Sequence, residues 1–333
     1  MKTELTIELG SSFIRIYKNN FGKIVDEPNV LIEKKDSKHR EFVAFGNDAK
    51  EKIGKLLQDE RYIFPVKEGK IVDYNACKRI LDFFLHGKIG SKNLIKKSCV
   101  IVVVSCGLDV CNLKMFQNLF FEVGFGQVFL VPQVIAIAKQ INQAENDADL
   151  IIDIGGGKTE IAIVTNNMII NGFAINIGGN LMDLGIIDAL KIDKKIIVST
   201  KIAEKIKINV ASLYSSDTSL TKIWAQDIST NLPKTVTISS KDISNIFLEI
   251  HQVIMNAIKA LISDVSMEIV TQISKRGVFY SGSGIVAGLE KYTKLEVGIK
   301  ASIINSKGES AVLGAMKFFD NYSVLNTIAY KLN

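Results

Sequence analysis

The sequence predicts an α/β protein built from two related halves. A pattern of two strands joined by a tight turn, with a carboxylate near the end of the first strand, occurs at residues 6–16 and again at residues 151–163. The two carboxylates, Glu8 and Asp153, are 145 positions apart (153 − 8 = 145). Strand-like and helix-like apolar periodicities alternate in both halves, which is typical of sheets flanked by helices. At about 150 residues per domain, a chain of 333 residues has room for two domains.

Both strand–turn–strand segments have the composition of β-hairpins. In residues 6–16, apolar residues alternate on either side of a tip at residues 10–12, and in residues 151–163 the corresponding tip lies at residues 155–157. Small residues at the tip and alternating apolar residues beside it predict a hairpin at each place. One such hairpin near the start of each half predicts a duplicated domain with a cleft between the halves.

The other elements of the first half follow from apolar periodicity. Residues 99–104 form a continuous apolar run that predicts a buried strand. Apolar positions between residues 110 and 123 share one face of a predicted helix, which Gly124 ends. Residues 127–131 predict a second strand, and a short helix near residues 135–138 follows it.

The second half has equally clear signals. Ser239–Asp242 resembles a helix N-cap and opens an apolar stripe that reaches Leu261, so a long core-packed helix is expected. Residues 278–280 predict a buried strand that ends in the turn 281–284. The polar segment 142–149 is the predicted boundary between the halves.

Composition excludes several classes of protein. With 47% hydrophobic and 23% charged residues, general disorder is excluded, and the longest apolar runs are too short to span a bilayer. The four cysteines lack Cys-x-x-Cys spacing and the three histidines are scattered. Buried thiols are therefore expected, and a zinc site, a disulfide framework or a Ser-His-Asp triad has no support. No N-terminal signal sequence is visible, so a cytoplasmic location is expected.

The net charge of +6 would suit a nucleic acid or an anionic lipid as partner. Lys, Ile and Asn are abundant, however, as expected from an AT-rich genome, and a Lys-rich surface then needs no polyanionic partner. We expect no nucleic-acid partner.

Three glycine-bearing turns, each after a strand, suit the binding of phosphate; they lie at residues 10–12, 155–157 and 282–284. Glycine lets backbone N–H groups converge on an anion. Glu8 and Asp153, two residues before the first two turns, can hold a hydrated Mg²⁺ against phosphate oxygens. A lone turn of this kind is more often a simple hairpin, but three turns with two carboxylates predict a nucleotide site. The P-loop and dinucleotide-binding motifs are absent.

This arrangement resembles the actin superfold, in which ATP and Mg²⁺ lie between two related domains, and within it MreB, the family of bacterial actin homologues. The resemblance covers nearly the whole chain and also includes Glu27–Val30, Gly46–Lys50, Pro65–Asp73, Ala203–Lys207, Asp227–Pro233 and Ser274–Gly277. Several of these segments lie outside the nucleotide site, which argues against sugar kinases and large chaperones. The Lys- and Ile-rich sequence is similar to MreB copies from wall-less helical bacteria.

The resemblance implies an actin-like fold of two duplicated α/β domains, each with a small subdomain, around a central nucleotide cleft. The first domain would comprise residues 1–146 and 310–333, with its small subdomain at about residues 32–70. The second domain would comprise residues 147–309, with its small subdomain at about residues 181–240.

The resemblance also implies which residues contact ATP or ADP and Mg²⁺. The implied ATP-binding residues are Gly10, Ser11, Ser12 and Phe13, then Gly155, Gly156, Gly157 and Lys158 at the phosphates, Glu204 and Lys207 at the ribose, and Gly282, Ser283, Gly284 and Ile285 beside the adenosine. Without the motif around them, Glu204 and Lys207 would be taken for an ion pair three positions apart on a helix. Glu8 and Asp153 would face Mg²⁺ through water.

Several departures from the family pattern fall on the chemistry. Glu8 stands where the family has Asp, and residues 11–13 replace a Thr-Ala-Asn turn. Gln133 aligns with the Glu that helps to position the attacking water; it can orient water but cannot accept its proton as a carboxylate would. Eukaryotic actin resembles this sequence in using Gln here, so hydrolysis is not excluded. Lys158 replaces a Thr, which removes a hydroxyl group and adds a cation.

The implied catalytic residues are Gln133, Asp153 and Lys158, and we predict tight ATP binding with weak hydrolysis. The Lys158 ammonium can bind the γ-phosphate, pair with a nearby carboxylate such as Glu8 or Asp153, or point into solvent. A cation that holds the ground state as tightly as the transition state favours binding without accelerating hydrolysis.

By resemblance, the protein is a slow ATPase that assembles into filaments of paired protofilaments, with roles in cell shape and motility. Other MreB paralogues and the anionic inner face of the cell membrane are further candidate partners. Leu94 and Ile95, ringed by lysines where the family carries a membrane loop, are the first membrane candidate, and the apolar tail at residues 318–330 is the second. The alternative function is a nucleotide-binding regulator of other MreB filaments that assembles and hydrolyses little itself. A sugar kinase on the same superfold is a third candidate, without an identifiable catalytic Asp or sugar-binding insertion.

Overall fold

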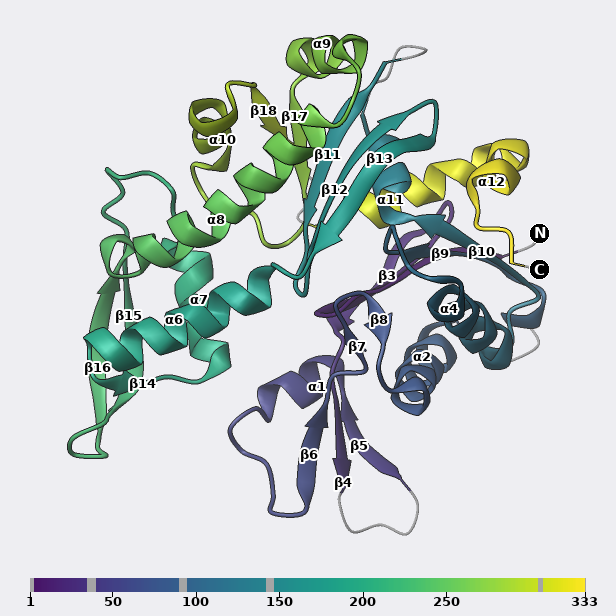
Figure 1. Cartoon of the computed structure of the whole chain (residues 1–333). Coiled ribbons are helices and arrows are strands. Elements are labelled where there is room, and N and C mark those ends of the chain that lie inside the picture. The colour runs from purple at the N-terminus through teal and green to yellow at the C-terminus, as the bar shows by residue number, and fades with distance from the viewer. Residues whose placement is uncertain (1–2, 35–39, 90–94, 142–146, 305–307, 333) are drawn as a thin grey trace.

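The computed structural model describes residues 3–34, 40–89, 95–141, 147–304 and 308–332. The fold is organised around two five-stranded sheets (Figure 1). The first sheet has the order β10 (Gln127–Pro132), β9 (Cys99–Val104), β1 (Glu4–Leu9), β2 (Phe13–Lys18) and β3 (Gly22–Pro28). Strands β1, β2 and β3 are successively antiparallel, whereas β1, β9 and β10 run parallel.

The second sheet repeats this plan. Its order is β13 (Met168–Ile175), β12 (Thr159–Thr165), β11 (Asp149–Ile154), β17 (Val278–Ser281) and β18 (Ala301–Ile303). Here β11, β12 and β13 are successively antiparallel, and β11, β17 and β18 run parallel. The hairpin β11–β12 thus occupies the place that β1–β2 has in the first sheet. The two predicted hairpins and the predicted duplication are confirmed.

Helices cover both faces of each sheet. Against the outer face of the first sheet lie α2 (Tyr74–Lys88) and α4 (Val110–Val123). Between the two sheets lie α5 (Gln133–Ala138) and α11 (Ser310–Met316), followed by a 3₁₀ turn, η1 (Lys317–Asp320), and by α12 (Tyr322–Ile328). Against the outer face of the second sheet lie α6 (Gly179–Asp193), α8 (Ser240–Ser263), α9 (Met267–Arg276) and α10 (Leu289–Val297). The layers therefore alternate helix, sheet, helix, sheet, helix.

Each half also carries a small sheet, and both extend from the same side of the molecule (Figure 1). In the first half it has the order β5 (Glu41–Phe45), β4 (Leu31–Lys34), β6 (Glu60–Ile63) and is accompanied by α1 (Gly46–Glu51). In the second half it has the order β14 (Ile196–Ile197), β15 (Leu220–Asp227), β16 (Pro233–Ser239) and is accompanied by α7 (Thr200–Val210). A short hairpin, β7 (Val66–Lys67) and β8 (Lys70–Ile71), returns the first small sheet to its domain. The exact domain bounds stay a prediction, and residues 142–146 of the proposed boundary lie outside the described residues.

Local sequence explains where the two longest predicted helices begin and end. The Asp109 side chain accepts the N–H of Asn112 at 2.8 Å, and Gly124 ends α4 in the left-handed conformation (φ 115°) that glycine adopts without strain. At the start of α8, Ser239 and Asp242 form a capping box. Both predicted helices are confirmed, as are the predicted strands at β9, β10 and β17.

Helix α8 is long and apolar enough to cross a membrane by length and composition alone. Its buried residues, which include Phe247, Ile254 and Ile258, instead pack in the core of the second half. Of the four cysteines, three are buried as expected, whereas Cys111 is exposed.

His251 on α8 is a buried titratable group in this core. Its Nδ1 lies 2.7 Å from the carbonyl oxygen of Phe247, to which it donates, and Nε2 has no hydrogen-bond partner among the described residues. Burial lowers the pKa of His251 to about 4. The imidazole is therefore neutral in the folded protein at neutral pH.

This burial predicts a pH-dependent stability. An unfolded histidine titrates near 6.5, so the unfolded chain binds a proton as the pH falls from 6.5 to 4 and the folded chain does not. The free energy of unfolding should therefore fall in this range. Between about pH 7 and about pH 4.5, the wild type should lose about 2–3 kcal/mol more than His251→Leu, measured by urea unfolding. Parallel pH profiles of the two proteins would contradict the buried neutral imidazole.

Candidate functional site

Two hairpin turns with the same hydrogen bond face each other between the halves. In the turn between β1 and β2, the N–H of Gly10 donates to the carbonyl oxygen of Phe13 at 2.9 Å. In the turn between β11 and β12, the N–H of Gly155 donates to the carbonyl oxygen of Lys158, also at 2.9 Å. The two turns therefore have matching geometry as well as matching sequence positions.

The turns approach each other closely enough that side chains on one of them would collide with the other. A Cβ atom at Gly156 would overlap the hydroxyl group of Ser12, and one at Gly157 would lie 2.7 Å from the hydroxyl oxygen of Ser11. The Ser12 hydroxyl donates across the gap to Oδ1 of Asn180 at 3.2 Å. Glycine at these positions is thus needed for the two halves to meet.

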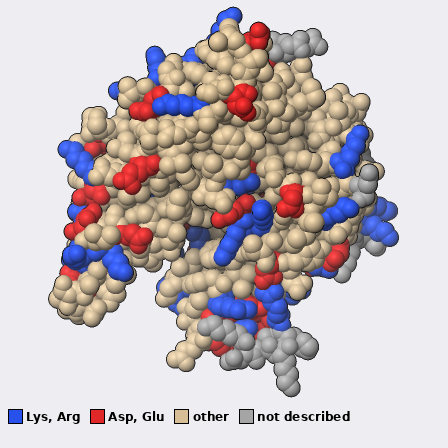
Figure 2. Space-filling view, viewed as in Figure 1, with Lys and Arg blue, Asp and Glu red and all other residues tan. Residues whose placement is uncertain are grey.

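A cavity between these turns, here called the turn-side cavity, gathers most of the predicted site. Thirteen predicted residues line it: Glu8, Gly10, Ser11, Ser12, Phe13, Gln133, Asp153, Gly155, Gly156, Gly157, Lys158, Gly282 and Ser283. Arg15 and Glu160 also line it, and neither was predicted. On the face of the molecule shown in Figure 2, Lys and Arg are interspersed with Asp and Glu instead of forming one basic surface.

Two further glycine segments support the second turn by backbone contacts. At the start of α6, the N–H groups of Gly179 and Asn180 donate to the carbonyl oxygens of Gly155 and Gly156 at 2.9 and 2.8 Å. In the turn after β17, the N–H of Gly284 donates to the carbonyl oxygen of Ile154 at 2.8 Å. The turn 282–284 therefore lies directly beside the turn 155–157, as its predicted role requires.

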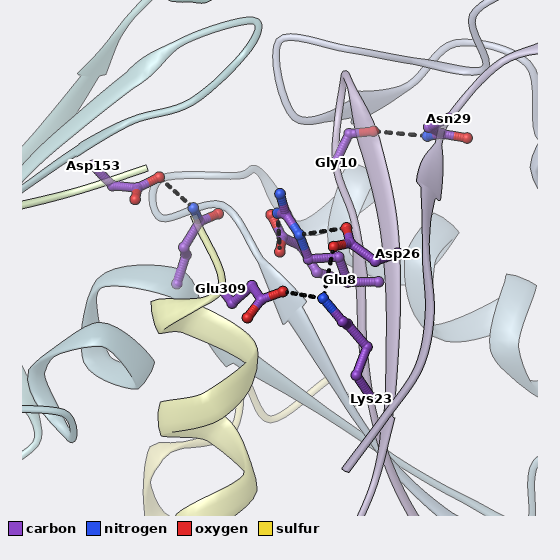
Figure 3. Close-up of polar contacts among 9 residues, drawn as sticks. Glu8, Gly10, Lys23, Asp26, Asn29, Asp153 and Glu309 are labelled. Atoms are coloured by element: carbon purple, nitrogen blue, oxygen red, sulfur yellow. Dashed lines mark hydrogen bonds and ion pairs between the residues drawn. The ribbon is translucent and has the colours of Figure 1, made fainter. Parts of the chain in front are cut away.

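Glu8 does not stand free in the turn-side cavity. Its carboxylate lies 2.9 Å from Nη1 of Arg15, which is its direct partner in the β1–β2 register. Nε of Arg15 also donates to Asp26 on β3 at 3.2 Å (Figure 3). Burial raises the pKa of Glu8, while the Arg15 guanidinium opposes this shift.

Asp153, the corresponding carboxylate of the second half, has a different partner. Nε2 of Gln133, at the first position of α5, donates to Asp153 at 2.5 Å (Figure 3). Burial, with Glu160 and Glu8 nearby, raises the pKa of Asp153 to about 7. No salt bridge of the described residues involves Asp153.

Lys158 pairs with a residue that the sequence analysis did not consider. Its ammonium nitrogen lies 3.1 Å from Oε1 of Glu160, and its side chain is only 11% exposed. The alternative that Lys158 points into solvent is therefore wrong. Pairing with a nearby carboxylate is confirmed, but the partner is Glu160 and not Glu8 or Asp153. The reason is that residues 158 and 160 project toward the same side of the hairpin. Glu160 also accepts the N–H of Cys106 in the first half at 3.1 Å.

A magnesium ion fits the site at Asp153 but not at Glu8. Mg²⁺ is usually bound by one or two carboxylates together with phosphate oxygens and water. Asp153 is a hard oxygen ligand without a cationic partner, whereas the Glu8 carboxylate is already bonded to Arg15. Within the described part of the chain, no group of three or more His, Cys, Asp or Glu residues is placed to hold a metal ion.

The predicted ribose pair is divided between two other cavities. Lys207 lines a cavity of about 290 Å³ together with Ser283, Gly284 and Ile285, the predicted adenosine-side loop. Glu204 lines a larger cavity of about 560 Å³ between the small subdomain of the first half and helices α6 and α7 of the second. The two residues do not pair with each other, which excludes the alternative that they form an ion pair on the surface of one helix.

Glu204 and Lys207 have separate ionic partners. Glu204 binds Lys50 of α1 at 2.7 Å across the cleft between the halves. Lys207 binds Asp183 of α6 at 2.8 Å and donates to the carbonyl oxygen of Gly179 at 2.9 Å. Lys207 thus contributes to holding the start of α6 beside the turn 155–157.

The membrane candidates require a correction. Leu94 lies outside the described residues. Ile95 is 0% exposed and packs in the core of the first half. Ile95 does not reach a membrane surface, because its side chain is buried in this core. The prediction failed because the Lys-rich sequence does not show which of its apolar residues enters the core.

The residues that sequence reasoning missed share one property, a charge at a buried strand position. Arg15 stands between the buried residues Ile14 and Ile16, and Glu160 precedes the buried residue Ile161. A charge inside a strand that is otherwise apolar was a usable signal, since buried charges are almost always paired. The sequence alone did not predict which residue would pair with Arg15 or with Glu160.

The duplicated sheets, the facing turns and the cavity between them define a protein of the actin-like class, with a site suited to a phosphate-bearing ligand between its halves. Comparison with known proteins identifies the family. The model of the MreB/Mbl protein family matches residues 2–327, so the chain belongs to the MreB/Mbl family. The resemblance to MreB stated from the sequence is confirmed.

Individual relatives agree with this assignment. The cell shape-determining protein Mbl of Bacillus subtilis is 26% identical over 326 residues, which is 97% of each chain. Structures of Spiroplasma citri MreB5 superpose with TM-scores of 0.91 (bound to AMPPNP, 24% identity) and 0.90 (bound to ADP, 25% identity), covering 98% of both chains. A MamK double helical filament superposes with a TM-score of 0.79 at 15% identity, covering 96% of this chain and 99% of that one. The actin-like fold is thereby confirmed.

The backbone contacts at the second turn predict the effect of adding one methyl group. A Cβ atom at Gly178 would lie 2.6 Å from the carbonyl oxygen of Gly156 and 2.7 Å from that of Gly155. Gly178→Ala should therefore lower the free energy of unfolding by about 1–3 kcal/mol, measured by chemical denaturation. Gly87→Ala is the matched control, because nothing lies within 4 Å of its Cβ position, and it should leave stability unchanged or higher. Equal losses in the two variants would contradict the close approach.

Proposed function

We propose that this chain is an ATP-binding actin-like protein that assembles into filaments, hydrolyses ATP slowly and acts in cell shape, with motility as a further role. The observation that carries the proposal is the pair of matching turns, Gly10–Phe13 and Gly155–Lys158, facing each other across the turn-side cavity. Backbone N–H groups at glycine turns suit phosphate oxygens. The family assignment and the nucleotides named in the S. citri MreB5 structures support the same proposal.

Two of the three cavities suggest how the nucleotide would lie. The phosphates would occupy the turn-side cavity, and the adenosine would occupy the cavity beside Lys207 and Ile285. Ser283 lines both cavities, so the two lie next to each other. Mg²⁺ bound with the phosphates would supply charge neutralisation, and Asp153 is the carboxylate available to it.

Slow hydrolysis follows from the groups near the phosphate end. Gln133 uses its amide N–H₂ group to bind Asp153, and its amide oxygen can orient a water molecule but is not a general base. Lys158 contributes a cation held by Glu160 where the family pattern has a hydroxyl group. Loss of one positioning group typically lowers a rate about 10²–10³-fold, so weak turnover is expected.

Filament assembly, location and partners extend the proposal. The family and the MamK filament support self-assembly, and paired protofilaments are the arrangement we propose. A cytoplasmic location with contact to the inner membrane face, and association with MreB paralogues, stay predictions.

Nucleotide binding and assembly can be tested together. Titration calorimetry of the purified chain with ATP should give saturable heat at one site per chain, and sedimentation with electron microscopy should show ATP-dependent filaments. Binding without pelleting would support the alternative, a nucleotide-binding regulator of other filaments. The absence of any heat of ATP binding would sink the proposed function.

The rate of ATP hydrolysis tests the roles of Gln133 and Lys158, the two residues that depart from the family pattern. Gln133→Glu combined with Lys158→Thr restores a carboxylate and a hydroxyl group near the phosphates, so phosphate release should rise by at least about tenfold. Lys234→Thr, which removes a surface lysine paired with Asp227 far from the cavity, is the matched control and should leave the rate unchanged. An unchanged rate in the double variant would show that these positions do not limit hydrolysis.

A further inference from the structure

Arg15 is a buried cation at the floor of the turn-side cavity. It lies within β2 and is 5% exposed. Its guanidinium is bonded to Glu8 on one neighbouring strand at 2.9 Å and to Asp26 on the other at 3.2 Å. Both carboxylates are its direct partners in the strand registers. A guanidinium held on both sides by adjacent strands has a fixed position in the sheet.

The second carboxylate extends this arrangement away from the cavity. Asp26 also binds Lys23 at 3.1 Å, and Lys23 binds Glu309, the residue before α11, at 2.7 Å. Negative and positive groups thus alternate from Glu8 to Glu309 (Figure 3). Every member of the series has a partner of opposite charge, which keeps Arg15 against Glu8.

The negative charge at the cavity floor is therefore smaller than the number of carboxylates there suggests. Of the three carboxylates that line the cavity, Glu8 is paired with Arg15 and Glu160 with Lys158. Only Asp153 has no salt bridge among the described residues, and it accepts a hydrogen bond from a neutral amide. A phosphate entering the cavity meets one unneutralised carboxylate in place of three.

A divalent cation contributes most to nucleotide binding where phosphate meets unneutralised carboxylates, because it removes their repulsion. We propose that Arg15 supplies the positive charge at Glu8 that a divalent cation would otherwise supply, so that nucleotide binding by this chain depends only weakly on Mg²⁺. This inference rests on the nucleotide-binding function proposed above. It assigns Arg15 the role of a positioning residue that acts through Glu8.

The test compares nucleotide affinity with and without the metal. The affinity of the full chain for ADP is measured by calorimetry in excess MgCl₂ and in EDTA. The dissociation constant of the wild type should differ less than about threefold between the two buffers. In Arg15→Met, Glu8 loses its buried partner and a divalent cation becomes its nearest replacement, so the difference should exceed about tenfold.

Two variants separate this role from a structural one. Lys23→Met removes a cation from the same series but leaves the Glu8–Arg15 contact, so it should behave like the wild type. Glu8→Gln combined with Arg15→Met removes both charges and should restore weak dependence on Mg²⁺. The melting temperature of the nucleotide-free protein gives an independent measure, since MnCl₂ should raise it more in Arg15→Met than in the wild type.

The outcomes are distinguishable. A wild-type difference above about threefold, or equal differences in the wild type and Arg15→Met, overturns the inference. If Arg15→Met does not fold, the size of the wild-type difference decides by itself. A wild type that binds no ADP in either buffer overturns the proposed function instead.

Discussion

The close backbone approach of two glycine turns is the constraint on which the rest of the structure depends. Gly156 and Gly157 lie against Ser12 and Ser11 with no room for a Cβ atom at Gly156 and too little at Gly157. Each turn ends a hairpin in the middle of a five-stranded sheet. Their contact therefore sets how the two sheets are placed relative to each other. It also means that the glycine turns of both halves form part of the cavity wall, where their backbone N–H groups suit an anion.

Much of this could be predicted because it is local. Alternating apolar residues around a small-residue tip specify a hairpin within about a dozen positions, and caps such as Ser239 and Gly124 mark helix ends within one turn. The duplication was visible because both hairpins carry a carboxylate at the same place. Gln133 was assigned to the site through the resemblance to the family, and Asp153 through its place just before the second turn.

The ion pairs could not be predicted, because each depends on which strands or helices become neighbours. Alternation along β2 shows which face a residue occupies but not the carboxylate it meets, so Arg15 was left without a role. Lys158 was expected beside the wrong carboxylates, although Glu160 is two residues away on the same strand face. Glu204 meets Lys50 only because α1 and α7 belong to halves that close on each other. Such pairs are properties of the tertiary structure.

The position of α11 has a consequence for the order in which the chain can fold during synthesis. This helix comes from the last part of the sequence, yet Ala311, Val312 and Ala315 complete the core beneath the first sheet. Gly314 lies so close to the backbone of Ala136 that no Cβ atom would fit between α11 and α5. The second half is continuous in sequence and can complete its folding while the chain is still on the ribosome. The first half is synthesised earlier, but it cannot complete its core until α11 has emerged.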